Sequence, residues 1–199
     1  MVLFKSVVPP EVTSLELEFM KSINSEVKIV GDDFINFSYI SLASEANQYQ
    51  PNFCQSNVAS KIAKNGGYCV SGWCIWKSPV LLEAQYHHVW MSPEGEIFDI
   101  TPKDDKAQRI LFVFDPKREY KGYPIQHKRK ILVDIPEVRK MIKFQDRIYK
   151  IQREYWVAYE NRIQPPPPRI MKEFYSFMKK LELITHQIEN FLRVSSEKK

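Results

Sequence analysis

The spacing of apolar and polar residues changes once along the chain, from a mixture of helix and strand patterns to helix patterns alone. Apolar residues three and four positions apart predict helices over residues 11–24 and 54–64. Short runs of aromatic and β-branched residues then predict strands. These strands lie at 68–70, 72–76, 83–91, 97–101 and 110–114, with a weaker one at 130–133. Short turns between them favour a small antiparallel sheet.

Glycines mark two turns of this predicted sheet. Asn65-Gly66-Gly67 is expected to end the helix that begins at Cys54, because glycine adopts the left-handed conformation found at helix ends. Ser92-Pro93-Glu94-Gly95-Glu96 is typical of a hairpin turn, with Gly95 at the position that needs a positive φ. Residues 47–53 read as the loop that leads into the helix.

The last third of the chain predicts two long helices. Apolar residues recur at helical spacing over 136–163 and again over 169–194, and the prolines from Pro165 to Pro168 separate the two stretches. We therefore expect an α+β fold. Its first domain, residues 1–134, would be a small antiparallel sheet with the Cys54 helix packed against it. Its second, residues 135–199, would be a basic helical hairpin.

Composition is that of an ordinary soluble globular protein, with 44% hydrophobic and 27% charged residues in 199. No apolar run approaches the roughly 18–20 residues of a membrane span. The first ten residues show no signal-peptide pattern, so we expect a cytoplasmic protein with reduced thiols.

Charge is distributed unevenly. Lys and Arg minus Asp and Glu gives −5 for residues 1–115 and +10 for residues 116–199. The basic half favours a solvated helical surface and could bind an acidic protein partner. It shows no DNA-reading motif, and specific nucleic-acid binding is not expected.

Three residue types required for thiol nucleophilic catalysis follow one another in the first domain. Cys54 begins a predicted helix, where the helix dipole and free N–H groups favour a thiolate. His87 and His88 lie on a predicted strand, and Asp99 interrupts the next apolar strand. A thiolate needs a base, and the base needs a third group to orient it. The order therefore predicts a catalytic triad of Cys54, His87 and Asp99.

The hairpin register decides which histidine faces Asp99. A three-residue loop pairs Val89 with Asp99 and puts His87 on the same face as the carboxylate, whereas a two-residue loop brings His88 there instead. A slip of one residue reverses every side chain. A glycine at the third loop position favours the three-residue loop, and hence His87.

Five short motifs resemble the transglutaminase-like and papain-like cysteine superfamily. They are Phe53-Cys54-Gln55-Ser56-Asn57-Val58, Val70-Ser71-Gly72-Trp73, His87-His88-Val89-Trp90, Pro93-Glu94-Gly95 and Phe98-Asp99-Ile100-Thr101-Pro102. The resemblance covers residues 50–102 and implies a papain-like or transglutaminase-like fold in which a Cys on a helix N-terminus meets a His and an Asp on neighbouring strands. The His-to-Asp segment is shorter than in typical transglutaminases.

The same resemblance implies residues around the reacting group. Papain-like enzymes hold the oxyanion with a Gln upstream of the nucleophile, and Gln48 has that spacing from Cys54. Trp73 and Trp90 could wall the cleft or fill the core. The expected function is acyl transfer on a protein or peptide carbonyl by a peptidase, amidase, deamidase or transglutaminase-type enzyme, with no cofactor.

Two other functional classes fit the same sequence. Cys54, Cys69, Cys74 and His87 could form a Cys₃His zinc site, although none of the cysteines forms a CxxC pair. Alternatively, the chain could be a non-catalytic binding module that recruits a partner through its basic helices.

Overall fold

The computed structural model describes residues 6–30, 33–103, 107–118, 120–121, 125–160 and 167–197, without the side chains of 156–160. The chain divides into two compact units. One comprises residues 6–119 and 127–130, and the other contains 131–199. The division falls after residue 130, inside the last strand (Lys128–Ile131), four residues before the boundary expected at 134.

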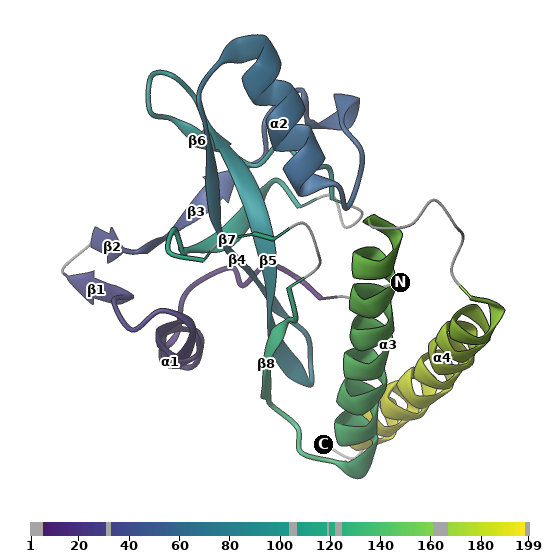
Figure 1. The fold of residues 1–199 in the computed structure, drawn as a ribbon. Coiled ribbons are helices and arrows are strands. Elements are labelled where there is room, and N and C mark those ends of the chain that lie inside the picture. Colours follow the sequence, from purple (N-terminus) through teal and green to yellow (C-terminus); the bar gives the residue numbers. More distant parts are fainter. Residues whose placement is uncertain are drawn as a thin grey trace. The chain divides into compact units, whose positions relative to one another are not determined.

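The first unit is α+β, with two α-helices, one short 3₁₀ helix and two antiparallel sheets in its described part (Figure 1). Its elements are α1 (Ser14–Ile23), β1 (Lys28–Val30), β2 (Asp33–Ile35), β3 (Phe37–Ser41), η1 (Ala46–Gln48), α2 (Cys54–Asn65), β4 (Tyr68–Lys77), β5 (Leu81–Met91), β6 (Ile97–Phe98), β7 (Arg109–Phe114) and β8 (Lys128–Ile131).

The larger sheet is nearly closed into a barrel. Its strand order is β3-β7-β4-β5-β6, and β8 pairs with β5 outside this path. The two ends of the order meet where Leu42, just after β3, bridges Asp99, just after β6. The Asp99 N–H donates to the Ser41 carbonyl at 3.0 Å, and the Ala43 N–H donates to the Asp99 carbonyl at 2.8 Å. Asp99 therefore lies at the seam of the barrel.

The barrel interior explains why these sequences form strands. Alternate residues of adjacent strands meet inside it, and they are apolar and buried: Ile40, Cys74, Val89, Ile110 and Phe112. Gly72 permits the close approach of β7, since a Cβ at this position would lie 2.2 Å from the Val113 carbonyl oxygen. Alternation also places His87, two residues before Val89, on the inner side.

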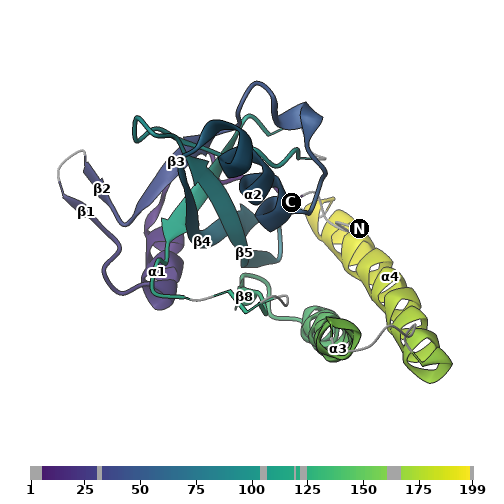
Figure 2. The same cartoon turned by 45° about the horizontal axis from the view of Figure 1, so that its top comes forward.

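Helix α2 lies against β4 and β5 (Figure 2). Val58 packs with Trp90 and Ile100, which fixes the helix on β5. The helix ends as expected, with Gly66 at φ +71° and Gly67 at φ +87°. A Cβ at Gly67 would lie 2.2 Å from the Met91 carbonyl oxygen, so the return from α2 to β4 requires glycine.

Several predicted strand boundaries differ from the observed ones. The strand predicted at 130–133 is β8, two residues earlier. The strands predicted at 68–70 and 72–76 form one continuous strand, β4. The strand predicted over 97–101 ends at Phe98, because at Asp99 the chain leaves β5 and pairs with β3 instead. β6 therefore pairs with β5 only at Trp90 and Met91. Helix α2 packs against β5 as well.

The second unit contains two long helices, α3 (Pro136–Glu160) and α4 (Pro168–Ser196), which pack against each other. The Phe144 and Phe177 rings lie 5.9 Å apart between them, and Arg147 pairs with Glu173. The predicted end of the first helix at Ile163 lies outside the described residues. No helix in the described part of the chain is long and apolar enough to cross a membrane.

Candidate active site

The Cys54 thiol lies at the first residue of α2, half-buried. No side chain caps this end of the helix, so its first N–H groups have no capping acceptor. The preceding loop is held by Asn57, which is 5% exposed. Its Nδ2 donates to the Gln50 carbonyl at 2.8 Å, and its Oδ1 accepts from the Gln50 N–H at 3.3 Å. This clamp fixes the approach to Cys54.

His87 and Asp99 form the partner of this thiol. The His87 Nε2 lies 3.0 Å from Asp99 Oδ1, and the carboxylate is fully buried. The same oxygen accepts the Thr101 N–H at 2.9 Å. Because Nε2 contacts the carboxylate, Nδ1 is the ring nitrogen that does not contact Asp99.

The observed register is the one that the three-residue loop predicts. Trp90 pairs with Phe98 and Met91 with Ile97, which puts Val89 opposite Asp99. The turn closes with the Ser92 N–H on the Glu96 carbonyl at 2.8 Å, and Gly95 has φ +93°. The structure therefore places His87, and not His88, beside Asp99.

The charges of this group favour a thiolate beside an imidazolium. Burial alone would raise the pKa of Cys54, but the His87 imidazolium, the His88 backbone N–H and the Lys103 charge outweigh burial and lower it. Burial and Lys103 oppose protonation of His87, yet the negative charges of Asp99 and Cys54 raise its pKa to about 9. The pKa of Asp99 is lowered despite its burial, chiefly by His87.

Lys103 is a member of this group that the sequence did not reveal. Its side chain is 11% exposed, and its Nζ lies 2.6 Å from Asp99 Oδ2. The carboxylate is therefore paired at both oxygens, with His87 at Oδ1 and with the Lys103 ammonium at Oδ2. The same Nζ lies 3.4 Å from His87 Nε2. A buried carboxylate with two oxygens needs more than one partner, and this rule could have pointed to a nearby lysine.

A second cysteine–histidine pair lies next to the first, on the outer face of β4 and β5. The Nδ1 of His88 lies 3.1 Å from the Ser71 hydroxyl and 3.3 Å from the Cys69 sulfur. Burial and the charge of His87 lower the pKa of His88 to about 4, so its ring is neutral at pH 7. Partial burial of the sulfur raises the pKa of Cys69. Within the described residues, none of the groups that shift the pKa of His88 or of Cys69 is a carboxylate, and the Cys69 thiol stays protonated at pH 7.

The other predicted site residues lie in different surroundings. Gln48 ends η1 and is exposed. Trp73 is 1% exposed, and its Nε1 donates to Asp115 Oδ2 at 2.9 Å. Trp90 is 8% exposed, and its Nε1 donates to the Gly66 carbonyl at 2.9 Å. Both indoles are therefore packed in the fold, which is the second of the two positions considered for them.

The four candidate zinc ligands do not converge. Cys69 and Cys74 are five residues apart on β4 and so point to opposite faces, with Cys74 buried in the barrel interior. In the part of the chain that the structure describes, no three or more His, Cys, Asp or Glu side chains are placed so that they could hold one metal ion.

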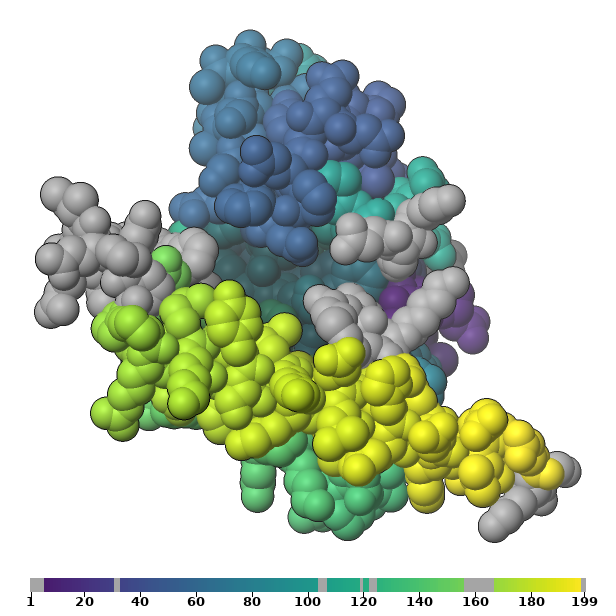
Figure 3. Space-filling model, turned by 90° about the vertical axis from the view of Figure 1, so that its right-hand side faces the viewer, coloured from purple at the N-terminus to yellow at the C-terminus, as the bar shows by residue number. Residues whose placement is uncertain are grey.

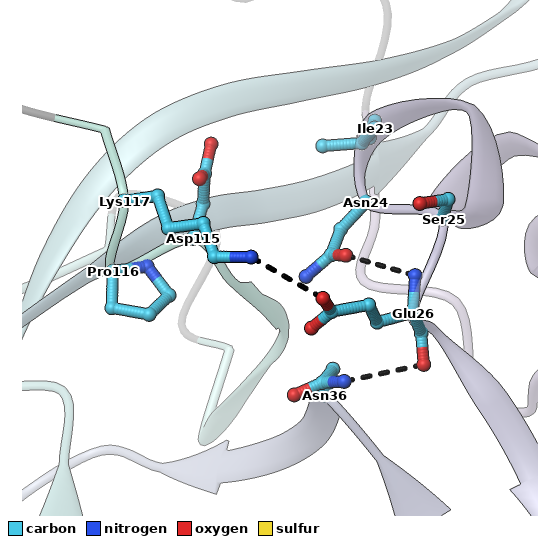
Figure 4. Close-up of a pocket in the computed structure, with 8 residues that line it drawn as sticks. All are labelled: Ile23, Asn24, Ser25, Glu26, Asn36, Asp115, Pro116 and Lys117. Carbon is cyan, nitrogen blue, oxygen red and sulfur yellow. Dashed lines mark hydrogen bonds and ion pairs between the residues drawn. The ribbon is translucent and has the colours of Figure 1, made fainter.

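A surface hollow of about 270 Å³ lies elsewhere in the first unit, between the end of α1 and the residues after β7 (Figure 4). Two of its charged side chains pair with each other, with Lys117 Nζ at 3.3 Å from Glu26 Oε1. The third, Asp115, pairs with Arg118 at 3.1 Å. The Asn36 amide donates to the Glu26 carbonyl at 3.2 Å. Cys54, His87 and Asp99 do not line it, so it is separate from the thiol site.

Comparison with known proteins gives no relative from which to transfer a function. No protein-family model, curated protein or solved structure matches the chain.

Proposed function

We propose that the first unit is a cysteine-dependent acyl-transfer enzyme that acts on a carbonyl or carboxamide of a protein or peptide. The observation that carries this proposal is the buried His87–Asp99 pair at 3.0 Å beside a Cys54 thiol whose pKa is lowered. A papain-like or transglutaminase-like arrangement is the corresponding fold proposal. In its favour are a helix that begins at the cysteine, a His on β5 and an Asp just after β6.

The reaction would begin with the Cys54 thiolate. Its sulfur attacks the carbonyl carbon, and the electron pair of the C=O bond moves to oxygen. The uncapped N–H groups at the start of α2 could bind this oxyanion, and Gln48 remains a predicted additional donor. The His87 imidazolium gives its Nδ1 proton to the departing amine, which leaves a thioester on Cys54.

The thioester would then be released with His87 acting as the base. The neutral imidazole takes a proton from water or from an acceptor amine, whose oxygen or nitrogen attacks the thioester carbon. The thiolate departs and the imidazolium forms again. Asp99 keeps the ring oriented and stabilises its positive charge throughout, as the orienting carboxylate does in a catalytic triad.

Replacement of the nucleophile tests this proposal. Cys54→Ala should abolish acylation of the protein by a thiol-directed acylating probe at pH 7, because Cys69 and Cys74 remain protonated or buried. Peptide mass spectrometry locates the label. Cys69→Ala is the matched control and should keep the label on Cys54. Undiminished labelling of the Cys54→Ala protein would remove Cys54 from the nucleophile role.

The second unit supports a different candidate function, recruitment of an acidic protein. Residues 131–199 contain 14 Lys and Arg against 9 Asp and Glu, a net charge of +5. Helix α4, whose outer side chains are seen in the space-filling view (Figure 3, green to yellow), exposes Tyr175 and Leu183, each at 62%. A surface on which exposed aromatic and aliphatic side chains lie among basic ones suits an acidic protein partner. A binding module would keep its partner when Cys54 is replaced by Ala.

A further inference from the structure

Lys103 occupies an unusual position for a lysine. It follows Asp99 by four residues, and its ammonium group lies 2.6 Å from Asp99 Oδ2 and 3.4 Å from His87 Nε2. The side chain is only 11% exposed, and lysine is seldom buried unless an anion compensates its charge. One carboxylate is therefore shared between two cations.

Charge balance explains what this sharing achieves. Without Lys103 the buried group would consist of a thiolate, an imidazolium and a carboxylate, with a net charge of −1. With Lys103 the charges of Cys54, His87, Asp99 and Lys103 alternate in sign and sum to zero. A net charge is costly in a low-dielectric interior, and an unopposed carboxylate would hold the imidazolium proton tightly. An imidazolium that holds its proton too tightly is a poor general acid.

We propose that Lys103 is a positioning residue of this site, which binds the second oxygen of Asp99 and sets the pH range in which Cys54 and His87 exist as a thiolate–imidazolium pair. The inference rests on the proposed function, because it assigns a role within the same site. Lys103 acts through Asp99 and His87 and does not touch the reacting carbon.

The direction of the effect follows from the groups around the ring. Within the described residues, Cys54, Asp99 and Lys103 are the titratable groups that act on His87, and the neighbouring His88 is neutral at pH 7. The positive charge of Lys103 lowers the pKa of His87 and that of Cys54. Its removal should therefore raise both. A residue needed only for packing would lower reactivity at every pH without moving the two ionisations together.

Alkylation by iodoacetamide measures both ionisations without a substrate. The rate at Cys54, read by peptide mass spectrometry, should rise once as the thiolate–imidazolium pair forms and again as His87 loses its proton. In Lys103→Met both steps should move to higher pH by about one unit, which is a tenfold change in each protonation ratio. Lys103→Arg keeps the charge and should stay closer to the wild-type profile.

Two further variants keep the test decisive. Lys64→Met, in the last turn of α2, removes an exposed lysine and should leave both steps in place. If Lys103→Met does not fold, the same substitution in an Asp99→Asn background should fold better than Asp99→Asn alone, because it removes an uncompensated buried cation. In that background Lys103→Met should still move both steps upward.

The outcomes separate this inference from the proposed function. If Cys54 of the wild-type protein ionises at the usual pH of a free thiol, the proposed function fails. If the wild-type protein shows the low first step but neither step moves in Lys103→Met, only the role of Lys103 is overturned. A uniform fall in rate with unmoved steps also overturns it.

Discussion

Two cysteine–histidine pairs lie side by side in this molecule and have opposite electrostatics. Neighbouring residues of β5 supply the two rings, and each ring has a thiol partner. The pKa of His87 is raised to about 9 while that of Cys54 is lowered. The pKa of His88 is lowered to about 4 while that of Cys69 is raised. Contact between a thiol and an imidazole is therefore not what activates a thiol.

The difference comes from the groups behind each ring. His87 has the buried carboxylate of Asp99 behind it, and Cys54 lies at a helix N-terminus with the His88 N–H beside its sulfur. His88 has a hydroxyl neighbour, Ser71, and the positive charge of His87 nearby. A carboxylate stabilises an imidazolium, whereas a hydroxyl and a neighbouring cation do not. Strand alternation puts one ring inside the barrel and the other outside it.

Replacing each histidine in turn by alanine should give the largest difference between the two pairs, measured as the rate of acylation at Cys54. His87→Ala removes the base and should slow acylation of Cys54 by the acylating probe by roughly 10²- to 10⁴-fold at pH 7. His88→Ala removes the ring but keeps the backbone N–H that contacts the Cys54 sulfur. It should therefore change the rate by less than about threefold. The measurement is the rate of label incorporation at Cys54. Equal effects of the two substitutions would show that the comparison is wrong.

Asp99→Asn should bring the first pair closer to the second. The amide keeps the shape of the carboxylate but removes its charge, so the pKa of His87 should fall and acylation of Cys54 should slow by about 10²-fold. The variant should also be less stable, by about 3–5 kcal/mol, because Lys103 loses its anion. Acylation rate and urea unfolding measure the two effects. Asp115→Asn, which removes an acid bound to Trp73 instead, should leave the acylation rate unchanged within about threefold.

A smaller effect is expected from the loop clamp. Asn57→Ala leaves the Gln50 N–H and carbonyl without their partner, which costs about 1–3 kcal/mol of unfolding free energy. The position of Cys54 should become less fixed, and acylation should slow by about tenfold at most. Asn65→Ala, at the exposed end of the same helix, is the control. Thermal unfolding that is unchanged in Asn57→Ala would contradict the clamp.

The sequence was sufficient for the parts of the site that depend on local pattern. The helix begins at Cys54 as predicted, and Gly95 in a three-residue loop sets the register that brings His87 to Asp99. These features need only a periodicity, a turn type and a strand length. No long-range contact enters the prediction.

Other parts depend on contacts between distant segments. Asp99 leaves its strand early because it pairs with Leu42, and no pattern within 97–101 contains that partner. Lys103 follows Pro102 in a polar stretch that reads as loop, so its burial against Asp99 is not visible in the sequence. Trp73 is suited equally to a cleft or a core, and the approach of Asp115 and β7 to β4 decides for the core.

The pH dependence of alkylation at Cys54 and Cys69 in the same wild-type sample tests the central claim most directly. Peptide mass spectrometry after timed exposure to iodoacetamide gives both rates from one experiment. The alkylation rate of Cys54 should first rise at a pH below the usual thiol pKa of about 8.5, with a second rise near pH 9 as His87 loses its proton. Cys69 should show one step, at or above the usual value. Coincident profiles for the two thiols would contradict the account.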